Sequence, residues 1–448
     1  MMIRIGNGCG FWGDNLDAPI ELAAHGRLDV LTLEYLAELT MSILAIQKQR
    51  DPTAGFATDF LDVLGRLTPH LLAQPKLQIV TNAGGMNPRA CAAKARAILD
   101  QANLANRRIG VVAGDDLLPR LDDLLAAGHP FTNLDTGEPL SAVRDRVVSA
   151  NAYLGSQPIA EVLAQGASLV ITGRVADAAL TVGPAAHVHG WRWDDWDRLA
   201  GGVVAGHLIE CGAQATGGLW INWDETDLNL VGYPIAEIEV DGTCRITKPP
   251  GTGGAVNVET VSEQLLYEVG DPAAYLTPDV VADFTRVALR DLGGDVVEVR
   301  SPRGRAATDS YKVSIAYRDG FAASGTLLIF GPHAEAKARR CGEMVRARLR
   351  RAGAEPRQFA VECLGAGDCV PGVIRAAAEP PEVVLRIAVR DPRKAVVERF
   401  SKELAPLVTS GPPGVTGYTT GRPAVRESFA YWPALVAKEA VTVETSLG

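Results

Sequence analysis

The sequence predicts an α/β protein that has a parallel-sheet N-terminal domain and a second, α+β domain. Three observations lead to this prediction: the length of the chain, the alternation of apolar runs with helical patterns in its first half, and hairpin-like segments in its second. The chain has 448 residues, whereas a single hydrophobic core stops growing at about 250–300 residues. We therefore expect residues 1–225 to form a domain with glycine-rich loops and residues 226–448 to form an α+β domain with ferredoxin-like elements.

In the first half, short apolar runs end in Gly, Asn or Asp and are followed by helical patterns, which is typical of βαβ units. The predicted strands are Met2–Ile5, Leu28–Leu33, Leu77–Val80, Ile109–Ala113 and Leu169–Ile171. Helices are expected from Glu34 through Gln49 and over Arg89–Asn103. Because open parallel sheets bind ligands at the carboxyl ends of their strands, we expect the five following loops to meet in one crevice.

The second half of the chain shows a less regular alternation of strand and helix patterns. Ile235–Val240 and Thr243–Lys248 read as a hairpin, and several strands are expected in residues 285–332. A long Arg-rich helix is expected over Ala334–Ala352, followed by a strand at Val383–Arg390 and a further helix. This order is compatible with a split βαβ arrangement. The segment Thr409–Pro423 reads as an ordered loop or a lid.

Composition and charge exclude several classes of function. The net charge of -9 disfavours nucleic acid as a partner. The seven cysteines show no CxxC pair and no zinc spacing, which indicates reduced thiols. Since no run of 18 apolar residues and no signal-peptide pattern occurs, we expect a cytoplasmic protein without membrane partners. We also expect a homo-oligomer.

The first two loops are candidate ligand contacts. Four glycines fall within eight residues after the first predicted strand, so backbone N–H groups there can approach a ligand. The spacing lacks the third glycine of GxGxxG, and a strained turn under Trp12 is the alternative. In the second loop a helix N-terminus can bind a carboxylate or phosphate, although Asn87-Pro88 also suits an N-cap. The substrate contacts predicted in these loops are Asn7, Gly8, Asp14, Asn82, Gly84, Gly85 and Asn87.

Charged side chains follow the fourth and fifth predicted strands. Asp115 and Asp116 could provide a base or hold a cation, and a solvated acidic turn is the alternative. Arg174 is a natural bidentate partner for an anionic substrate group. Asp177 is a further candidate contact, with pairing to Arg174 as the other interpretation.

Two later motifs complete the candidate site. His207 and Glu210 share a helix face at i, i+3 and suggest an acid/base pair, with a metal pair less favoured. Cys211 beside them is interpreted as a small core residue rather than a nucleophile. Lys248 opens a Pro/Gly-rich loop that resembles a phosphate cradle but lacks the P-loop order, which excludes an NTPase.

Taken in order, these motifs resemble the AtuA family, which is named for acyclic terpene utilisation. The resemblance is carried by Arg4–Gly8, Phe11–Asp14, Leu33–Met41, Thr81–Pro88, Gly114–Asp116, Asn151–Gly155, Thr172–Asp177, Gly206–Cys211, Lys248–Gly254 and Gly421–Pro423. It implies a role in catabolic routes for branched acyl-CoA or carboxylic acid intermediates. Some relatives carry an extra C-terminal ferredoxin-like domain. The resemblance therefore leaves open that a separate small partner subunit supplies such a domain to this chain. The resemblance supplies no catalytic residues.

The function expected first is a lyase, either a hydro-lyase or a carbon–carbon lyase, that acts on a small organic acid or its CoA thioester. Such chemistry needs a base beside a carbonyl and donors for the enolate oxygen. Glu34, Asp116 and His207 are the base candidates, and we expect no cofactor, with a divalent metal ion as the less favoured alternative. The alternative is a non-catalytic subunit that binds acyl-CoA within a catabolic enzyme complex. A nucleotide-dependent dehydrogenase ranks last because the glycine fingerprint is missing.

Overall fold

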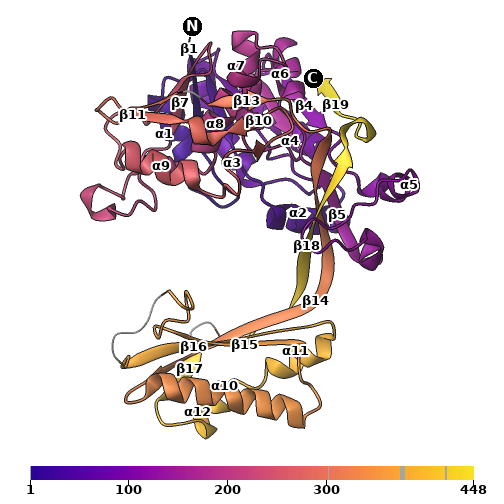
Figure 1. Cartoon of the computed structure of the whole chain (residues 1–448), viewed down its shortest axis with the longest axis vertical. Helices are drawn as coiled ribbons and strands as arrows, with labels where there is room; N and C mark the ends of the chain where they lie inside the picture. The colour runs from indigo at the N-terminus through magenta and orange to yellow at the C-terminus, as the bar shows by residue number, and fades with distance from the viewer. Residues whose placement is uncertain (1, 301, 374–378, 419–420) are drawn as a thin grey trace. The chain divides into compact units, whose positions relative to one another are not determined.

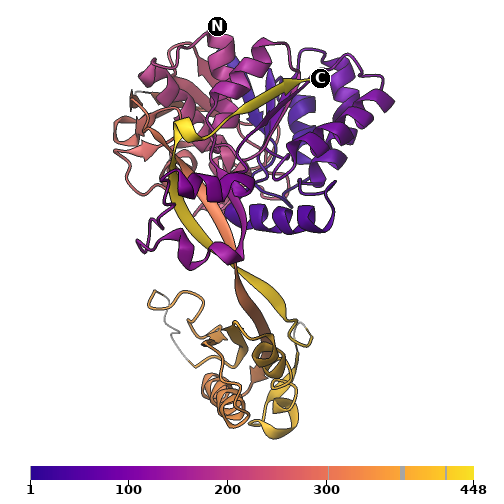
Figure 2. The same ribbon diagram turned by 90° about the vertical axis from the view of Figure 1, so that its right-hand side faces the viewer.

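The computed structural model describes residues 2–300, 302–373, 379–418 and 421–448 (Figure 1). The chain divides into two compact units: unit 1 contains Met1–Ala316 and Tyr431–Gly448, and unit 2 contains Tyr317–Ala430. Both termini lie in unit 1 (Figure 2). The sequence had placed the division between residues 225 and 226. The observed boundary lies later because the strands in residues 235–300 join the same sheet as the first strands of the chain.

The centre of unit 1 is a ten-stranded sheet with the order β11-β12-β8-β7-β1-β2-β3-β6-β4-β19. Its five middle strands are parallel, which confirms the predicted parallel sheet. They are β1 (Met2–Asn7), β2 (Val30–Leu33), β3 (Gln78–Thr81), β6 (Leu169–Thr172) and β4 (Ile109–Ala113). The outer strands are antiparallel: β7 (Ile235–Glu239), β8 (Cys244–Thr247), β12 (Val297–Arg300), β11 (Ala288–Asp291) and β19 (Glu444–Leu447).

Helices cover the sheet because parallel strands need both faces buried. All four residues of β2 and of β6 are buried. One core joins the strands to side chains of α1 (Ala18–His25), α3 (Asp59–Ala73) and α4 (Pro88–Gln101). The remaining larger helices of unit 1 are α2 (Glu38–Arg50), α5 (Leu121–Ala126), α6 (Gln157–Ala164), α7 (Ala179–His189), α8 (Trp196–Glu210) and α9 (Val258–Leu266).

Glycine in α8 lets this helix approach the loop that follows β6. A Cβ on Gly206 would lie 2.8 Å from the Cα of Ala178. The missing side chain therefore brings the C-terminal turn of α8 close to the end of the parallel sheet. Shorter strands complete the unit: β9 (Tyr275–Leu276), β10 (Val281–Asp283) and β13 (Arg303–Arg305) form a small sheet, and β5 (Val147–Ala152) pairs with β14 (Ser310–Phe330).

Unit 2 has the order of a split βαβ fold. Four antiparallel strands are arranged as β15-β16-β14-β17, with β15 at Gln358–Leu364, β16 at Glu382–Asp391 and β17 at Val415–Tyr418. Helices α10 (Ala334–Arg351), α11 (Lys394–Phe400) and α12 (Leu407–Ser410) intervene along the chain, and the ribbon shows α10 and α12 on one face of the sheet (Figure 1). This is a ferredoxin-like topology. Strand β18 (Arg426–Ala437) pairs with β14. The segment predicted as a loop or lid contains β17, while its residues 419–420 lie outside the described ones.

Candidate functional site

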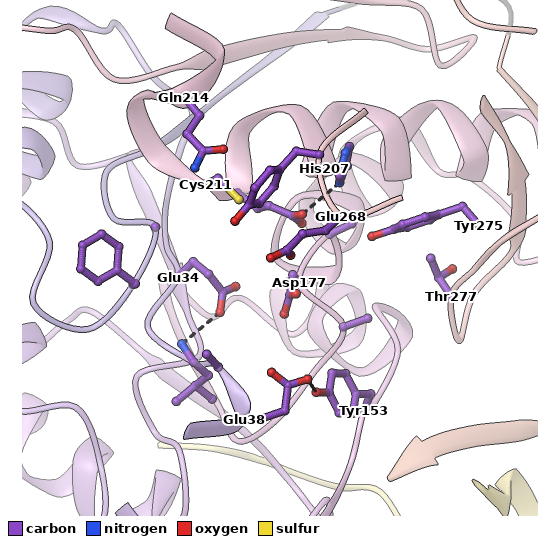
Figure 3. A pocket seen from close by; sticks show the side chains of 18 of the residues that line it. Glu34, Glu38, Tyr153, Asp177, His207, Cys211, Gln214, Glu268, Tyr275 and Thr277 are labelled. Carbon is purple, nitrogen blue, oxygen red and sulfur yellow. Dashed lines mark hydrogen bonds and ion pairs between the residues drawn. The ribbon is translucent and has the colours of Figure 1, made fainter. Parts of the chain in front are cut away.

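A cavity of about 780 Å3 opens in unit 1 at the carboxyl ends of the parallel strands. The loops after β1, β2 and β6 line it together with the end of α8 and residues 267–277 (Figure 3). The loops after β3 and β4 do not reach its surface. They lie behind it, where they hold the residues that do. The sequence expectation of five loops around one crevice thus gives way to three lining loops and two supporting ones.

Glu34 is held at the cavity wall by only one of its carboxyl oxygens. Oε1 accepts hydrogen bonds from Nδ2 of Asn82 and, at 3.2 Å, from the backbone N–H of Leu36. Asn82 is itself oriented by the backbone N–H of Tyr35, which donates to its Oδ1 at 2.8 Å. Oε2 is buried and has no hydrogen-bond partner among the described residues. Burial first, and then the charge of Asp177, raise the pKa of Glu34 well above its usual range, although Arg174 and Asn82 oppose this.

Arg174 is a buried cation beside this carboxyl group. Its Nη1 lies 2.7 Å from Oδ1 of Asp177 and 4.0 Å from Oε1 of Glu34. The guanidinium also stands 4.1 Å above the ring of Tyr153, a cation–π contact. Burial alone would lower the pKa of Arg174, but the neighbouring acidic groups outweigh it and the pKa rises. The side chain therefore stays charged.

Asp115 supports the loop that carries Arg174. Its Oδ2 accepts hydrogen bonds from the backbone N–H of Arg174 at 2.9 Å and from Nδ2 of Asn151 at 2.8 Å. Burial raises the pKa of Asp115 to about 6. Asp116 does not line the cavity: its Oδ1 accepts from the N–H of Leu118 at 3.2 Å, and its Oδ2 lies 3.5 Å from Nζ of Lys48.

His207 and Glu210 form the predicted pair on α8. Nδ1 of His207 lies 3.0 Å from Oε1 of Glu210. Burial raises the pKa of Glu210 to about 6. The charges of Asp177 and Glu268 raise this pKa further, whereas the hydrogen bond and charge of His207 lower it. For His207, burial lowers the pKa, but the hydrogen bond and charge of Glu210 outweigh it and the pKa rises. Oε2 of Glu210 is a second buried carboxyl oxygen without a partner among the described residues.

Cys211 follows this pair and also lines the cavity. Burial raises the pKa of its thiol to about 12, and Glu210 adds to the effect. A thiol with this pKa carries almost no thiolate at neutral pH, so its environment does not activate it as a nucleophile.

Of the residues predicted from the sequence, six line the cavity: Asp14, Glu34, Arg174, Asp177, His207 and Glu210. The others lie elsewhere: Asn7, Gly8, Asn82, Gly84, Gly85, Asn87, Asp115, Asp116 and Lys248. Asn7 donates to the carbonyl oxygens of Ile209 and Glu210, which ties β1 to the end of α8. Asn87 caps α4, as the alternative interpretation expected. Lys248 donates to the carbonyl of Thr252 and pairs with Asp295 at 3.0 Å.

The glycines among them have packing roles. A Cβ on Gly8 would lie 2.8 Å from the Cα of Pro19, and one on Gly84 would lie 2.5 Å from the carbonyl oxygen of Thr172. Gly85 adopts a φ of 50°, in the region that favours glycine. These positions thus need glycine for close packing or backbone conformation, whether or not a ligand is bound.

Sequence reasoning missed one wall of the cavity. Tyr153 donates from its hydroxyl to Oε1 of Glu38 at 2.6 Å, and Nζ of Lys312 lies 3.4 Å from the same oxygen. Burial opposes ionisation of Glu38, but the hydrogen bond from Tyr153 and the charge of Arg174 lower its pKa to about 2. Glu38 and Tyr153 lie in segments that carry the family resemblance, and this position in the motifs was the one sequence signal that could have identified them. Residues 267–277, including Glu268, carry no motif.

The cavity is strongly acidic. Seven acidic side chains line it, against the two cationic side chains of Arg174 and Lys312. The acidic side chains belong to Asp14, Glu34, Glu38, Asp177, Glu210, Glu268 and Asp271. Among the described residues, no group of three His, Cys, Asp or Glu side chains is arranged to hold a metal ion. The arrangement can exchange protons with a ligand and hold one anionic oxygen at Arg174.

Comparisons with known proteins identify the family. A comparison with curated proteins gave no match. Within the described part of the chain, none of the helices combines the length and the apolar composition needed for a bilayer crossing. The model of the acyclic terpene utilisation family protein AtuA matches residues 3–447. Because this match covers nearly the whole sequence, the chain belongs to the AtuA family.

Proposed function

We propose that the protein is a lyase of the hydro-lyase type that acts on a small organic acid or its CoA thioester, with Glu34 as the proton-transfer group. One observation carries the proposal. The carboxyl group of Glu34 is fixed through Oε1, while its buried Oε2 has no partner among the described residues of a cavity large enough for a substrate. A catabolic role is consistent with the family.

The chemistry follows from the two groups at this wall. Oε2 of Glu34 removes the proton from the carbon next to the substrate carbonyl. The electron pair passes into an enolate, whose oxygen the guanidinium of Arg174 stabilises as its charge develops. The β-hydroxyl then takes the proton from Glu34 and leaves as water, and hydration is the reverse of these steps. Because burial raises the pKa of Glu34, its ionised form is a stronger base than an ordinary carboxylate.

The charge of the cavity favours an uncharged reacting end. The lining carboxylates would repel the phosphates of CoA, so only the acyl end of a thioester would enter. A free organic acid has one cationic partner at this wall, Arg174, which Asp177 already neutralises in part. Of the two substrate classes, the thioester is therefore the better match to the charges of the cavity side chains.

The test is proton exchange and turnover with a substrate panel. The purified chain is incubated in D2O with enoyl-CoA, 3-hydroxyacyl-CoA and hydroxy-acid panels, and mass spectrometry follows gain or loss of water and deuterium at the α-carbon. We expect Glu34→Gln to lower kcat/KM by about 10²–10⁴-fold. Glu263→Gln, an exposed residue of α9 outside the cavity, is the matched control.

Two results would count against the proposal. Turnover that Glu34→Gln leaves unchanged would remove Glu34 from the chemistry. Binding of acyl-CoA without exchange or turnover by any member of the panel would instead support the non-catalytic acyl-CoA-binding subunit.

A further inference from the structure

Two carboxyl groups of the cavity share one arrangement, in which the protein fixes one oxygen and leaves the other free. Glu34 is the first of them. In Glu210, at the end of α8, Oε1 lies 3.0 Å from Nδ1 of His207. Its Oε2 is buried and has no hydrogen-bond partner in the part of the chain that the structure describes. The proposed elimination uses the free oxygen of Glu34, whereas that of Glu210 has no part in it.

Packing around His207 keeps the carboxyl group of Glu210 in place. The imidazole ring is 1% exposed, and its centroid lies 5.5 Å from that of Tyr275 and 5.4 Å from that of Phe284. The backbone is held as well, since Nδ2 of Asn7 donates to the carbonyl oxygen of Glu210 at 2.9 Å. Because the imidazole and the backbone are both fixed, the carboxyl group stays at the wall of the cavity.

The free oxygen of Glu210 requires a hydrogen-bond donor from a ligand. Because the pKa of Glu210 is about 6, most of the group is ionised at neutral pH, and an ionised carboxylate only accepts hydrogen bonds. A buried acceptor without a partner costs free energy. The thioester and alkyl parts of an acyl group carry no polar donor, whereas a hydroxyl group carries one. Glu210 therefore favours a substrate with a hydroxyl group.

Asp177 relates the two carboxyl groups to one region of the cavity. Its charge raises the pKa of Glu34 and that of Glu210, so both carboxyl groups lie near it. Figure 3 shows the side chains of Glu34 and Asp177 directed into the same part of the cavity, and a dashed line joins His207 to Glu210. Neighbouring carbon atoms of one small substrate are therefore able to meet Glu34 and Glu210.

We propose that Glu210 selects a hydroxylated substrate: its free Oε2 accepts a hydrogen bond from the β-hydroxyl group, and His207 positions the carboxyl group for this contact. The inference rests on the proposed function, because it names the substrate class of the same site as a 3-hydroxyacyl thioester. While the hydroxyl hydrogen is bonded to Glu210, the hydroxyl oxygen keeps its lone pairs for the proton that Glu34 returns. An acyl group without the hydroxyl leaves Oε2 buried and unpaired, so the site discriminates against it.

Matched ligands that differ only in the hydroxyl group test this inference. Isothermal titration calorimetry measures the dissociation constants of 3-hydroxybutyryl-CoA and butyryl-CoA, and of the corresponding hexanoyl pair. The full-length Glu34→Gln variant is used, so that no ligand is turned over. We expect each hydroxyacyl-CoA to bind about 10–100-fold more tightly than its saturated counterpart, which is the strength of a hydrogen bond to a charged group.

Substitutions of Glu210 in the same background assign this preference to its carboxyl group. Glu210→Leu should abolish the preference, because the hydroxyacyl-CoA binds more weakly while the saturated thioester binds as well as before or more tightly. Glu210→Gln keeps an acceptor oxygen and should retain part of the preference. Glu263→Gln, outside the cavity, should retain all of it. Circular dichroism verifies that each variant is folded.

The outcomes separate this inference from the proposed function. Equal dissociation constants within both pairs, or no binding of either hydroxyacyl-CoA, would overturn the inference, as would a preference that both Glu210 variants leave unchanged. Turnover by the wild type without any such preference would overturn it while leaving the lyase intact. A preference that depends on Glu210, together with no turnover of any panel substrate by the wild type, would support the hydroxyl contact and contradict the lyase.

Discussion

The two units of the chain bury different kinds of side chain. Unit 1 buries charged and amide groups at the carboxyl ends of its parallel strands, among them Glu34, Asn82, Asp115 and Arg174. Unit 2 packs an apolar core between its helices and sheet, and its two buried charged side chains, Asp391 and Glu403, each pair with an arginine close by in the chain. Buried polar groups cost free energy unless each is paired. The difference agrees with the position of the candidate functional site in unit 1, where a cluster of several coupled polar side chains is retained at the end of the sheet.

The chain offers a convenient way to follow the two units separately. Its seven tryptophans are Trp12, Trp191, Trp193, Trp196, Trp220, Trp223 and Trp432, and all of them lie in unit 1. Tryptophan fluorescence therefore reports on unfolding of unit 1, whereas far-ultraviolet circular dichroism reports on both units. The four predictions below use this contrast.

The largest effect is expected from Arg174→Met. The change removes the buried cation and leaves Glu34 and Asp177 without their charged partner. Breaking a buried ion pair costs about 3–5 kcal/mol, and because Asp177 is 40% exposed to water the cost here lies at the lower end of this range. The free energy of unfolding, measured by urea titration with tryptophan fluorescence, should fall by that amount. Arg174→Lys keeps the charge, so the free energy of unfolding should fall less for this variant. A loss no larger than that of an exposed arginine would contradict the view that the polar cluster is tightly coupled.

An apolar substitution in the core of unit 2 should lower the free energy of unfolding by a comparable amount, but the change should be detected by a different spectroscopic probe. Leu385 on β16 is fully buried in the core of unit 2. Leu385→Ala should lower the free energy of unfolding by about 2–5 kcal/mol, because it removes buried surface and leaves a cavity. The shift should appear in the circular dichroism transition and leave the fluorescence transition in place. An equal shift in fluorescence would show that the two cores unfold as one.

How far the sequence could predict these two regions follows from local physics. The parallel strands were predictable, because strands buried on both faces read as aliphatic runs that end in polar loops. The unit boundary was not, since the hairpin at residues 235–247 reveals its own pairing but not the sheet that it extends. Asn82 shows the same limit at the site. Sequence places an amide at a strand end, but only the fold shows that Glu34, rather than a ligand, faces it.

The polar cluster also predicts how stability depends on pH. The pKa of Asp115 rises from its ordinary 3.8 to about 6 in the folded chain, chiefly through burial. The folded form thus holds the proton more tightly, so this contribution to stability is complete below pH 3.8 and is lost as pH rises through about 6. A shift of this size corresponds to at most about 3 kcal/mol.

Asp115→Asn should remove this dependence. The difference between the unfolding free energies of wild type and variant should change across that pH range, measured by fluorescence-detected urea titration. Leu72→Ala, at an exposed position on α3 and without an ionisable group, is the control and should give a difference that does not vary with pH. If the curve for Asp115→Asn is equally flat, the carboxyl group of Asp115 is not buried as the structure has it.

The smallest effect is expected from an ion pair on the surface of unit 2. Nη1 of Arg340 lies 2.8 Å from Oε2 of Glu343 on α10, and the two side chains are 67% and 66% exposed. This distance is close to that between Arg174 and Asp177. Water screens the exposed pair, however, and its formation costs side-chain entropy, so Arg340→Ala should change the free energy of unfolding by less than about 1 kcal/mol. The free energy of unfolding is measured by urea titration with circular dichroism. A cost approaching that of Arg174→Met would mean that contact distance, and not burial, sets the strength of these pairs, and the contrast between the two units would lose its physical basis.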